Sequence, residues 1–374
     1  MRIIDYQYSV MTSTNGSKKI PVTLLTGFLG SGKSTLLSNL LNDQRFENTA
    51  VVVNEFGATG LDGLLIQHAE EQIVEMTSGC LCCTVRGDIH ETLMMLSGKR
   101  EKEQISKFDR LVIETTGLAD PAPVIHTLMN DPLLDRRYFL GGVVTTIDAL
   151  SGVETLNAHF ESQKQAAVAD RIVVTKTDLL EGASSNDRLS NLRELISSLN
   201  HLAPIIDPQA PEFSPNELFN TSLYDPETKG MNVRRWLNSE AEDFDHHQSH
   251  DSLHSHEHSH SHDISRHGSD IRSFTLTFNF PIDVENFATS IEALTILHGS
   301  NLLRIKGVIK TKDQPNKPLV IHGVQHIFHD PIWLDAWPDS DEKTRLVFIT
   351  KGIERQSLED YFKAWLDQES IQWS

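Results

Sequence analysis

Cysteine is scarce in this chain, and the three that occur are Cys80, Cys82 and Cys83, within four consecutive positions. Disulfide frameworks distribute their cysteines along a chain, so this cluster argues against such a framework and indicates a reducing compartment, which we take to be the cytoplasm. Three thiols so close together indicate instead a metal or redox role.

Long apolar runs and excess positive charge are absent as well. No stretch reaches the ~18 consecutive apolar residues of a transmembrane helix, so we expect no membrane partner. Residues 1–19 lack the basic and apolar stretches of a secretory signal and are expected to form a flexible N-terminus. Acidic residues number 52 against 33 basic ones, a net charge of −19, which argues against nucleic acid as a partner.

Residues 20–240 alternate short β-branched runs with helical patterns. The expected strands are nearly all apolar, which predicts a mostly parallel sheet covered by helices on both faces, an α/β doubly wound domain. The expected strands are Val22–Thr26, Ala50–Asn54, Gln72–Met76, Arg110–Glu114, Gly142–Ile147 and Arg171–Thr175. The expected helices are Ser34–Leu41, Arg86–Leu96, Ala122–Met129 and Asp187–Leu199.

Residues 241–268 are dominated by His, Ser and Asp and show no apolar periodicity, so they are expected to form a flexible linker. Nine histidines lie between His246 and His267. Imidazoles at H-x-H-x-H spacing allow several shifting chelates, which predicts a metal collector of low specificity, with a merely polar linker as the alternative.

Residues 269–374 are expected to form a smaller C-terminal α+β domain, because strand-like alternation and helical patterns resume there. The expected strands are Ser273–Phe280, Leu302–Lys310, Lys317–His322 and Arg345–Thr350, and the expected helices are Val284–Leu297 and Leu358–Trp365.

The strongest motif is GFLGSGKS, from Gly27 to Ser34, which fits the P-loop pattern G-x-x-x-x-G-K-[ST] between an apolar strand and a helix. Its backbone amides and the helix N-terminus are suited to bind phosphates. Lys33 is expected to reach the β- and γ-phosphates as a catalytic residue, and Ser34 to ligate Mg²⁺. The predicted nucleotide-binding residues of this segment are Gly27, Gly30, Ser31, Gly32, Lys33, Ser34 and Thr35.

A second element, ETTG, follows the expected strand RLVIE. Glu114 stands where a Walker B carboxylate positions Mg²⁺ or its water, and we predict this catalytic role for it. Gly117 would let the backbone approach the γ-phosphate.

The base is predicted from the segment TKTD, which follows the strand RIVV and resembles the NKxD element of GTPases. Asp178 would accept the ring N–H and the exocyclic amine of guanine, a donor pair that adenine lacks. Lys176 would lie along the base plane. Thr175 stands where many GTPases carry Asn, and GTP remains favoured over ATP.

The three cysteines follow a strand and precede a helix, a place where thiolates have lowered pKa values and ligate soft metals. Two or three cysteines leave a tetrahedral site incomplete, which suits transfer of a metal better than a permanent structural site. Buried structural thiols are the alternative. Cys and His ligands accept Zn²⁺, Co²⁺ and Ni²⁺ alike, so the residues alone leave the metal open.

Together the motifs GFLGSGKST, NEFG, GCLCC, ETTGLADP and TKTD resemble the CobW-type P-loop GTPases, a family of metal chaperones. The C-terminal segments LLRIKGVI, VIHGVQHIF and RLVFITKG extend the resemblance over nearly the whole chain. It implies a protein that needs GTP and Mg²⁺ and carries Zn²⁺, or in some members Co²⁺, to a client metalloenzyme. It places the metal at the CxCC cysteines and leaves a switch role for Glu55 of NEFG, a further candidate ligand.

Two other functions remain as alternatives: a metal buffer that uses the His tract with a regulatory GTP site, and a maturation factor for a cobalt or cobalamin pathway. A second copy of the chain, in a homodimer, is a further partner to consider. Since no Gln or Arg finger for the hydrolytic water is evident from the sequence, we expect slow intrinsic GTP hydrolysis.

Overall fold

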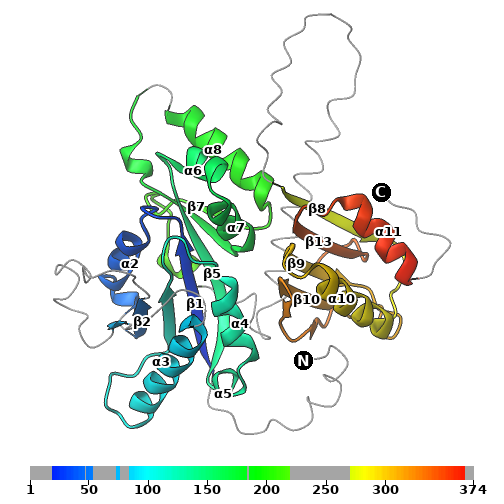
Figure 1. Cartoon of the computed structure of the whole chain (residues 1–374), viewed down its shortest axis with the longest axis horizontal. Coiled ribbons are helices and arrows are strands. Elements are labelled where there is room, and N and C mark those ends of the chain that lie inside the picture. Colours follow the sequence, from blue (N-terminus) through cyan, green and yellow to red (C-terminus); the bar gives the residue numbers. More distant parts are fainter. Residues whose placement is uncertain are drawn as a thin grey trace, which may run out of the picture.

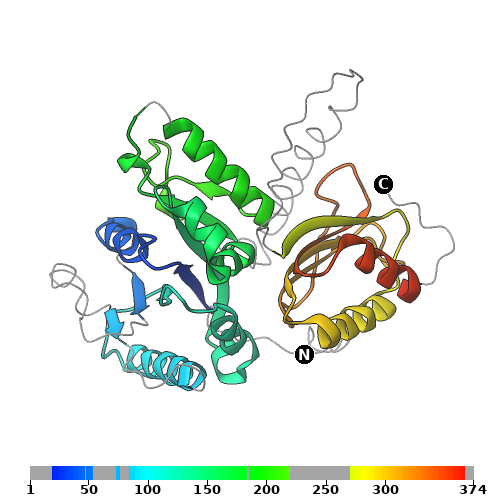
Figure 2. The same ribbon diagram turned by 45° about the horizontal axis from the view of Figure 1, so that its top comes forward.

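The structure is a computed structural model, and it describes residues 19–46, 48–53, 73–75, 84–182, 185–219 and 270–366. We call residues 19–219 of this set the first domain and residues 270–366 the C-terminal domain. Each is built around one sheet, and the two sheets lie side by side with helices between and around them (Figure 1, Figure 2).

The first domain contains a parallel sheet of seven strands in the order β3-β2-β4-β1-β5-β6-β7. Its strands are β1 (Ile20–Gly27), β2 (Thr49–Val53), β3 (Ile73–Glu75), β4 (Arg110–Glu114), β5 (Tyr138–Asp148), β6 (Arg171–Thr175) and β7 (Ile205–Ile206). The helices are α2 (Lys33–Leu41), α3 (Thr84–Glu101), α4 (Ala122–Asn130), α5 (Pro132–Asp135), α6 (Gly152–Ala158), α7 (Phe160–Val168) and α8 (Ser185–Leu199).

Alternating apolar side chains of these strands pack into two cores, one on each face of the sheet. On β1, for example, Leu24 packs in the core under α3, α4, α7 and α8, whereas Leu25 packs in the core under α2. Both side chains are at most 3% exposed. Since both faces are covered, the strands are nearly all apolar, and the predicted doubly wound α/β fold is confirmed.

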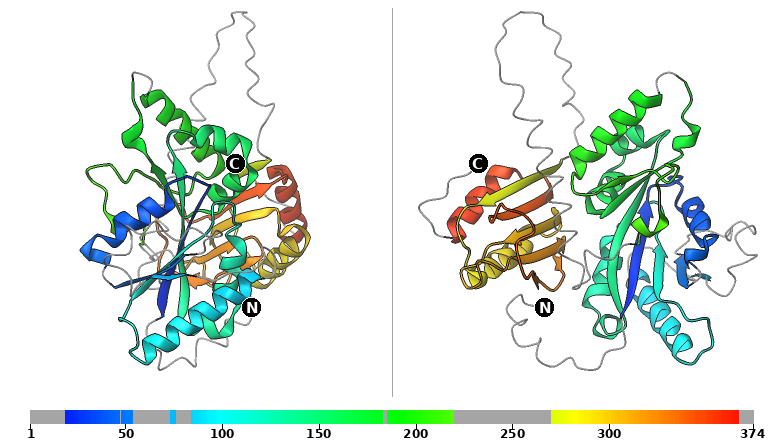
Figure 3. Two further views of the ribbon diagram at one scale, coloured as in Figure 1. Left: turned by 60° about the vertical axis from the view of Figure 1, so that its left-hand side comes forward. Right: turned by 180° about the vertical axis from the view of Figure 1, so that it is seen from behind.

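The C-terminal domain is an antiparallel sheet in the order β11-β10-β9-β13-β8, with β12 paired to β10. Its elements are β8 (Ile271–Phe278), α10 (Val284–His298), β9 (Leu302–Ile309), β10 (Leu319–Val324), β11 (Ile327–Phe328), β12 (Ile332–Trp333), β13 (Thr344–Lys351) and α11 (Arg355–Leu366). Helices α10 and α11 cover the face turned away from the first domain, and the opposite face lies against it (Figure 3).

The two domains share a core, because Ile271, Leu303, Val324, Ile327 and Ile349 of the C-terminal sheet belong to the same apolar cluster as α7 and α8. The C-terminal domain is therefore packed on the first domain through buried apolar side chains, as within one folded body.

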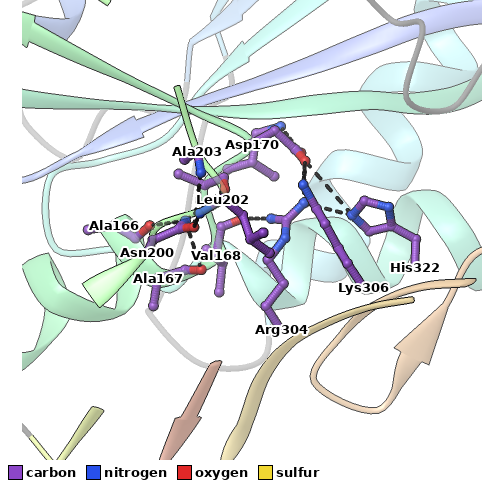
Figure 4. Close-up of polar contacts among 12 residues, drawn as sticks. Ala166, Ala167, Val168, Asp170, Asn200, Leu202, Ala203, Arg304, Lys306 and His322 are labelled. Carbon is purple, nitrogen blue, oxygen red and sulfur yellow. Dashed lines mark hydrogen bonds and ion pairs between the residues drawn. The ribbon is translucent and has the colours of Figure 1, made fainter. Parts of the chain in front are cut away.

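A buried ion pair lies at the centre of this contact (Figure 4). Arg304 of β9 donates to the Asp170 carboxylate and to the carbonyl of Val168, and its guanidinium also donates to His322 Nε2 at 2.8 Å. The side chains of Arg304 and Asp170 are both 0% exposed. Lys306 Nζ lies 3.6 Å from the same carboxylate.

Burial alone would raise the pKa of Asp170, but Arg304, Lys306 and the Val143 amide together lower this pKa to about 2. Burial, followed by the neighbouring Arg304 guanidinium, lowers the pKa of Lys306 to about 7. Arg304 is therefore the main counter-charge of Asp170, and the carboxylate stays ionised at all physiological pH values.

No helix of the described part of the chain is long and apolar enough to cross a membrane.

Replacing Asp170 with Asn should lower the free energy of unfolding by about 3–5 kcal/mol, because the Arg304 guanidinium would be left buried without its counter-charge. Urea denaturation measures this loss. The control is Asp109→Asn, which removes an exposed carboxylate 3.5 Å from Arg110 and should change stability by less than about 0.5 kcal/mol.

Because the folded pKa of Asp170 lies below the ordinary 3.8, the contribution of Asp170 to the free energy of unfolding is complete above that value and is lost as pH falls towards about 2. Equal losses in the two variants at pH 7 would contradict the role assigned to the pair.

Candidate nucleotide site

The P-loop connects the carboxyl end of β1 to the start of α2, at the point where the strand order reverses around β1. Open parallel sheets bind ligands at this position. Gly32 caps α2 with φ 86°, a left-handed conformation that favours glycine. The helix therefore begins at Lys33 with its first amides facing the loop, which is the arrangement that binds a phosphate.

Lys33 folds back over the loop. Its Nζ donates to the carbonyls of Gly27 at 2.8 Å and Phe28 at 3.1 Å, and its side chain is buried. Burial lowers the pKa of Lys33, and the Glu114 carboxylate partly offsets this effect. The ammonium thus lies against the backbone of the P-loop, and its contact with the phosphates of a nucleotide remains a prediction.

Ser34 and Glu114 lie together, although 80 positions separate them in the sequence: Ser34 Oγ donates to Glu114 Oε1 at 2.9 Å. Glu114 ends β4, which pairs with β1 in the sheet, so the two carboxyl ends meet. A hydroxyl and a carboxylate are hard oxygen ligands that suit Mg²⁺. These residues fit the predicted magnesium position.

The ETTG turn presses directly on the P-loop. A Cβ atom added at Gly117 would lie 2.6 Å from the Leu29 amide nitrogen and 2.7 Å from Leu29 Cα. At the base of the turn, Thr115 Oγ1 donates to Thr26 Oγ1 at 3.0 Å, and the Thr115 amide donates to the Leu25 carbonyl at 2.9 Å. Only glycine allows the turn and the phosphate loop to approach each other this closely.

The predicted base-recognition segment begins at the carboxyl end of β6. Thr175 Oγ1 donates to the Ser31 carbonyl of the P-loop at 2.8 Å, which ties the two segments together. Lys176 adopts φ 59° and pairs with Asp148 at the end of β5. The Asp178 carboxylate is exposed to solvent in the following short helix (Thr177–Leu179).

The structure adds residues that sequence reasoning missed. Asp148 holds Lys176, Thr146 Oγ1 lies 2.6 Å from Ser31 Oγ, and Asp207 Oδ1 accepts from Thr177 at 2.8 Å. Asp148 ends β5 and Asp207 directly follows β7, so both lie at the carboxyl end of a strand of the parallel sheet, which is the same signal that identified Glu114. The signal was present, but the strand β7 of Asp207 was not among the expected strands.

Other predicted residues fall outside the described part of the chain: Cys80, Cys82, Cys83, Glu55 and the His tract. Among the residues that the structure describes, no three His, Cys, Asp or Glu side chains form a group that could hold a metal. The metal site therefore stays a prediction.

Two family models match the chain. The model described as CobW/HypB/UreG, nucleotide-binding domain, matches residues 21–207, and the model of the cobalamin synthesis protein cobW C-terminal domain matches residues 271–366. The chain belongs to the CobW family. The resemblance inferred from the motifs is thereby confirmed.

Curated relatives and a solved structure agree with this assignment. The chain is 33% identical to the zinc chaperone YjiA of Escherichia coli (strain K12) over 330 residues, which cover 88% of this chain and 93% of YjiA. It is 24% identical over 390 residues to the zinc-regulated GTPase metalloprotein activator 1 of Saccharomyces cerevisiae, covering 95% of this chain and 86% of that protein. The crystal structure of the Zn(II)-bound YjiA GTPase from E. coli superposes with a TM-score of 0.65 at 27% identity, covering 93% of this chain and 99% of that one.

Gly117→Ala should slow GTP hydrolysis about 10²-fold, because the new methyl group would displace the turn from the P-loop by an amount that active sites do not tolerate. The matched control is Gly98→Ala on α3, where an added Cβ meets no atom within 4 Å. The control should keep full activity and gain a little stability, since alanine is the better helix former. Release of phosphate measures the rate of GTP hydrolysis in both variants. Equal rates in Gly117→Ala and Gly98→Ala would contradict the role assigned to the contact between the turn and the P-loop.

Asp178→Asn should weaken GTP binding and relax discrimination against xanthine nucleotides, because the amide no longer accepts both guanine donors. Titrations of wild type and variant with GTP, ATP and XTP measure this change. Wild-type affinity for ATP equal to that for GTP would overturn the assignment of the base.

Proposed function

We propose that this chain is a GTP-dependent metallochaperone that binds Zn²⁺, or Co²⁺, at Cys80, Cys82 and Cys83 and delivers it to a client metalloprotein as GTP is hydrolysed. The observation that carries the proposal is an assembled nucleotide site in a CobW-family chain that aligns with nearly the full length of a zinc chaperone.

In this proposal residues 20–240 form the GTPase domain, 241–268 the His-rich linker and 269–374 the C-terminal domain. The P-loop residues Gly27, Gly30, Ser31, Gly32 and Thr35 surround the phosphates. Thr175, Lys176 and Asp178 bind the base, and the exposed Asp178 carboxylate is open to a ligand.

Lys33 and Glu114 carry the proposed hydrolysis. The Lys33 ammonium exchanges the Gly27 and Phe28 carbonyls for phosphate oxygens and so neutralises charge that develops in the transition state. Ser34 and Glu114 would hold Mg²⁺, which supplies further neutralisation of the phosphate oxygens when bound. The turn at Gly117 contacts Leu29 of the P-loop. In this proposal the backbone of the turn lies beside the γ-phosphate, so the position of the turn affects how that phosphate is bound.

Zinc is the favoured cargo, because the relatives covering most of this chain are named for zinc. Thiolate ligands suit that ion, and an incomplete cysteine set would let a client supply the missing ligands. In the proposal Glu55 links the metal to the nucleotide, the His tract collects metal at low specificity, and the chain acts in the cytoplasm. A storage protein would bind as much metal without hydrolysis, so turnover separates it from a chaperone.

Zinc should bind about 5- to 150-fold more tightly to the chain filled with a non-hydrolysable GTP analogue than to the chain filled with GDP, because coupling between two sites has this size. Competition titration against a zinc chelator dye measures the tight site. A variant that lacks residues 246–267 should keep the tight site and the coupling and lose only weakly bound ions.

The Cys82→Ser/Cys83→Ser variant should lose the tight site but keep its affinity for GTP. Equal zinc affinity in the two nucleotide states would refute the switch, and an unchanged tight site in the cysteine variant would refute the ligands.

A further inference from the structure

Helix α7 lies beside the nucleotide site, although sequence analysis assigned it no role. Its preceding residue His159 stacks on Phe28 of the P-loop, with ring centroids 4.4 Å apart and an interplanar angle of 24°. Lys164 on the helix pairs with Asp120 at 2.6 Å, just after the ETTG turn. Two segments that surround the phosphates thus contact the first half of this helix.

Gln165 makes the closest connection. Its Nε2 donates to the carbonyls of Gly117 and Ala119, both at 3.1 Å, so both amide protons are committed to the turn. Since both partners are acceptors, they fix which end of the amide faces the turn. The side chain is 1% exposed and is held in place as well by the helix backbone, whose Gln165 carbonyl accepts from Thr145 Oγ1 at 2.8 Å.

A buried glutamine at this position costs free energy, because its polar atoms are removed from water. Its Oε1 is buried and has no hydrogen-bond partner among the residues that the structure describes. An apolar side chain of the same size would avoid that unsatisfied atom, and buried polar groups of this kind call for a specific explanation. The two bonds to the turn supply one, because Gly117 is the residue pressed against Leu29 of the P-loop.

The ends of the same helix are held by the C-terminal domain. Lys351 of β13 places its Nζ 3.6 Å from the centroid of the Phe160 ring, at the first residue of α7. At the last residue, the Val168 carbonyl accepts from the buried Arg304 (Figure 4). Asn200 Nδ2 lies within hydrogen-bond distance of the carbonyls of Ala166, Ala167 and Ala169 and shares its two protons among them, so the carbonyls at the end of the helix have partners.

We propose that Gln165 is a positioning residue for the γ-phosphate of GTP, acting through the Gly117–Ala119 turn, and that α7 makes this position depend on the C-terminal domain. The inference rests on the proposed function only in taking GTP as the ligand. If the γ-phosphate displaces the turn, the two hydrogen bonds displace Gln165 with it. Because Gln165 is part of α7, the displacement reaches the contacts of this helix with Arg304 and Lys351. Conversely, a partner that shifts the C-terminal domain would alter the preference for GTP over GDP, as reciprocity requires.

The first test is Gln165→Met in the full chain, which keeps the volume and removes both donors. Binding of a non-hydrolysable GTP analogue and of GDP is measured with Mg²⁺ present. The preference for the analogue should fall about 5- to 30-fold, the effect of losing two ordinary hydrogen bonds. GDP affinity should not change, since GDP has no γ-phosphate to meet the turn.

The matched control is Gln163→Met, two residues earlier on the same helix. Gln163 is equally an amide buried in the fold, but it donates to the Leu156 carbonyl at 2.6 Å, away from the turn. This control should keep the wild-type preference. A second variant, Lys164→Met, removes the ion pair with Asp120 and changes a side chain that is partly exposed. It should lower the preference in the same direction, and it tests the proposal if Gln165→Met does not fold. The positioning role would be overturned if Gln165→Met kept the wild-type preference or lost the same affinity for GDP as for the analogue. If Gln165→Met does not fold, the same two outcomes in Lys164→Met would overturn it.

The second test concerns the C-terminal domain. Lys351→Gln removes the cation above Phe160 and should lower the same preference about 2- to 5-fold. In a double variant with Gln165→Met it should cause no further loss, because the two act through one helix. Additive losses, or no loss in Lys351→Gln, would overturn the role of α7. Zinc affinity independent of nucleotide would refute the chaperone proposal and leave these nucleotide preferences as they are, so the two failures are distinguishable.

Discussion

The buried pair of Asp170 and Arg304 is the constraint on which the arrangement of the two domains depends. Asp170 sits at the junction of α7 and β6, and Arg304 reaches it from the middle of the C-terminal sheet. An unpaired charge at either position would be strongly unfavourable in this buried contact, so the two domains have one relative position that satisfies both. That position also fixes the last carbonyl of α7 and, five residues beyond Asp170, the start of the segment that carries Thr175 and Lys176.

The candidate nucleotide site lies at one edge of the first domain because the strands of its sheet are parallel. Every strand that contributes to it points its carboxyl end in one direction, so Gly27, Glu114, Asp148 and Thr175 meet although they are far apart in the chain. Their mutual bonds join the P-loop, the ETTG turn and the base segment in one network. Preorganisation of this kind lowers the cost of binding and allows small displacements at the γ-phosphate position to reach other parts of the molecule.

Local patterns were sufficient to predict the fold class and the nucleotide motifs, because apolar strands and glycine-rich turns have strong signatures. Helix α7 was not predicted: its sequence FESQKQAAV is largely polar or small, and its buried face is formed by Ser162, Gln163, Gln165 and alanines that tertiary contacts cover. Strand β5 begins at Tyr138 instead of Gly142, since two glycines obscure a strand whose register shifts opposite Val22 and Thr23. The pairing of Asp170 with Arg304 spans 134 positions, and no pattern within one segment encodes such a contact.

We propose that hydrolysis of GTP releases the metal. The most direct measurement is a single turnover of GTP on the zinc-loaded full chain, with phosphate release and capture of zinc by a fluorescent chelator followed in the same sample. We expect zinc to appear in step with phosphate, and we expect a non-hydrolysable analogue to keep the metal bound over the same time. Zinc release at one rate with GTP, with the analogue and with GDP would contradict it.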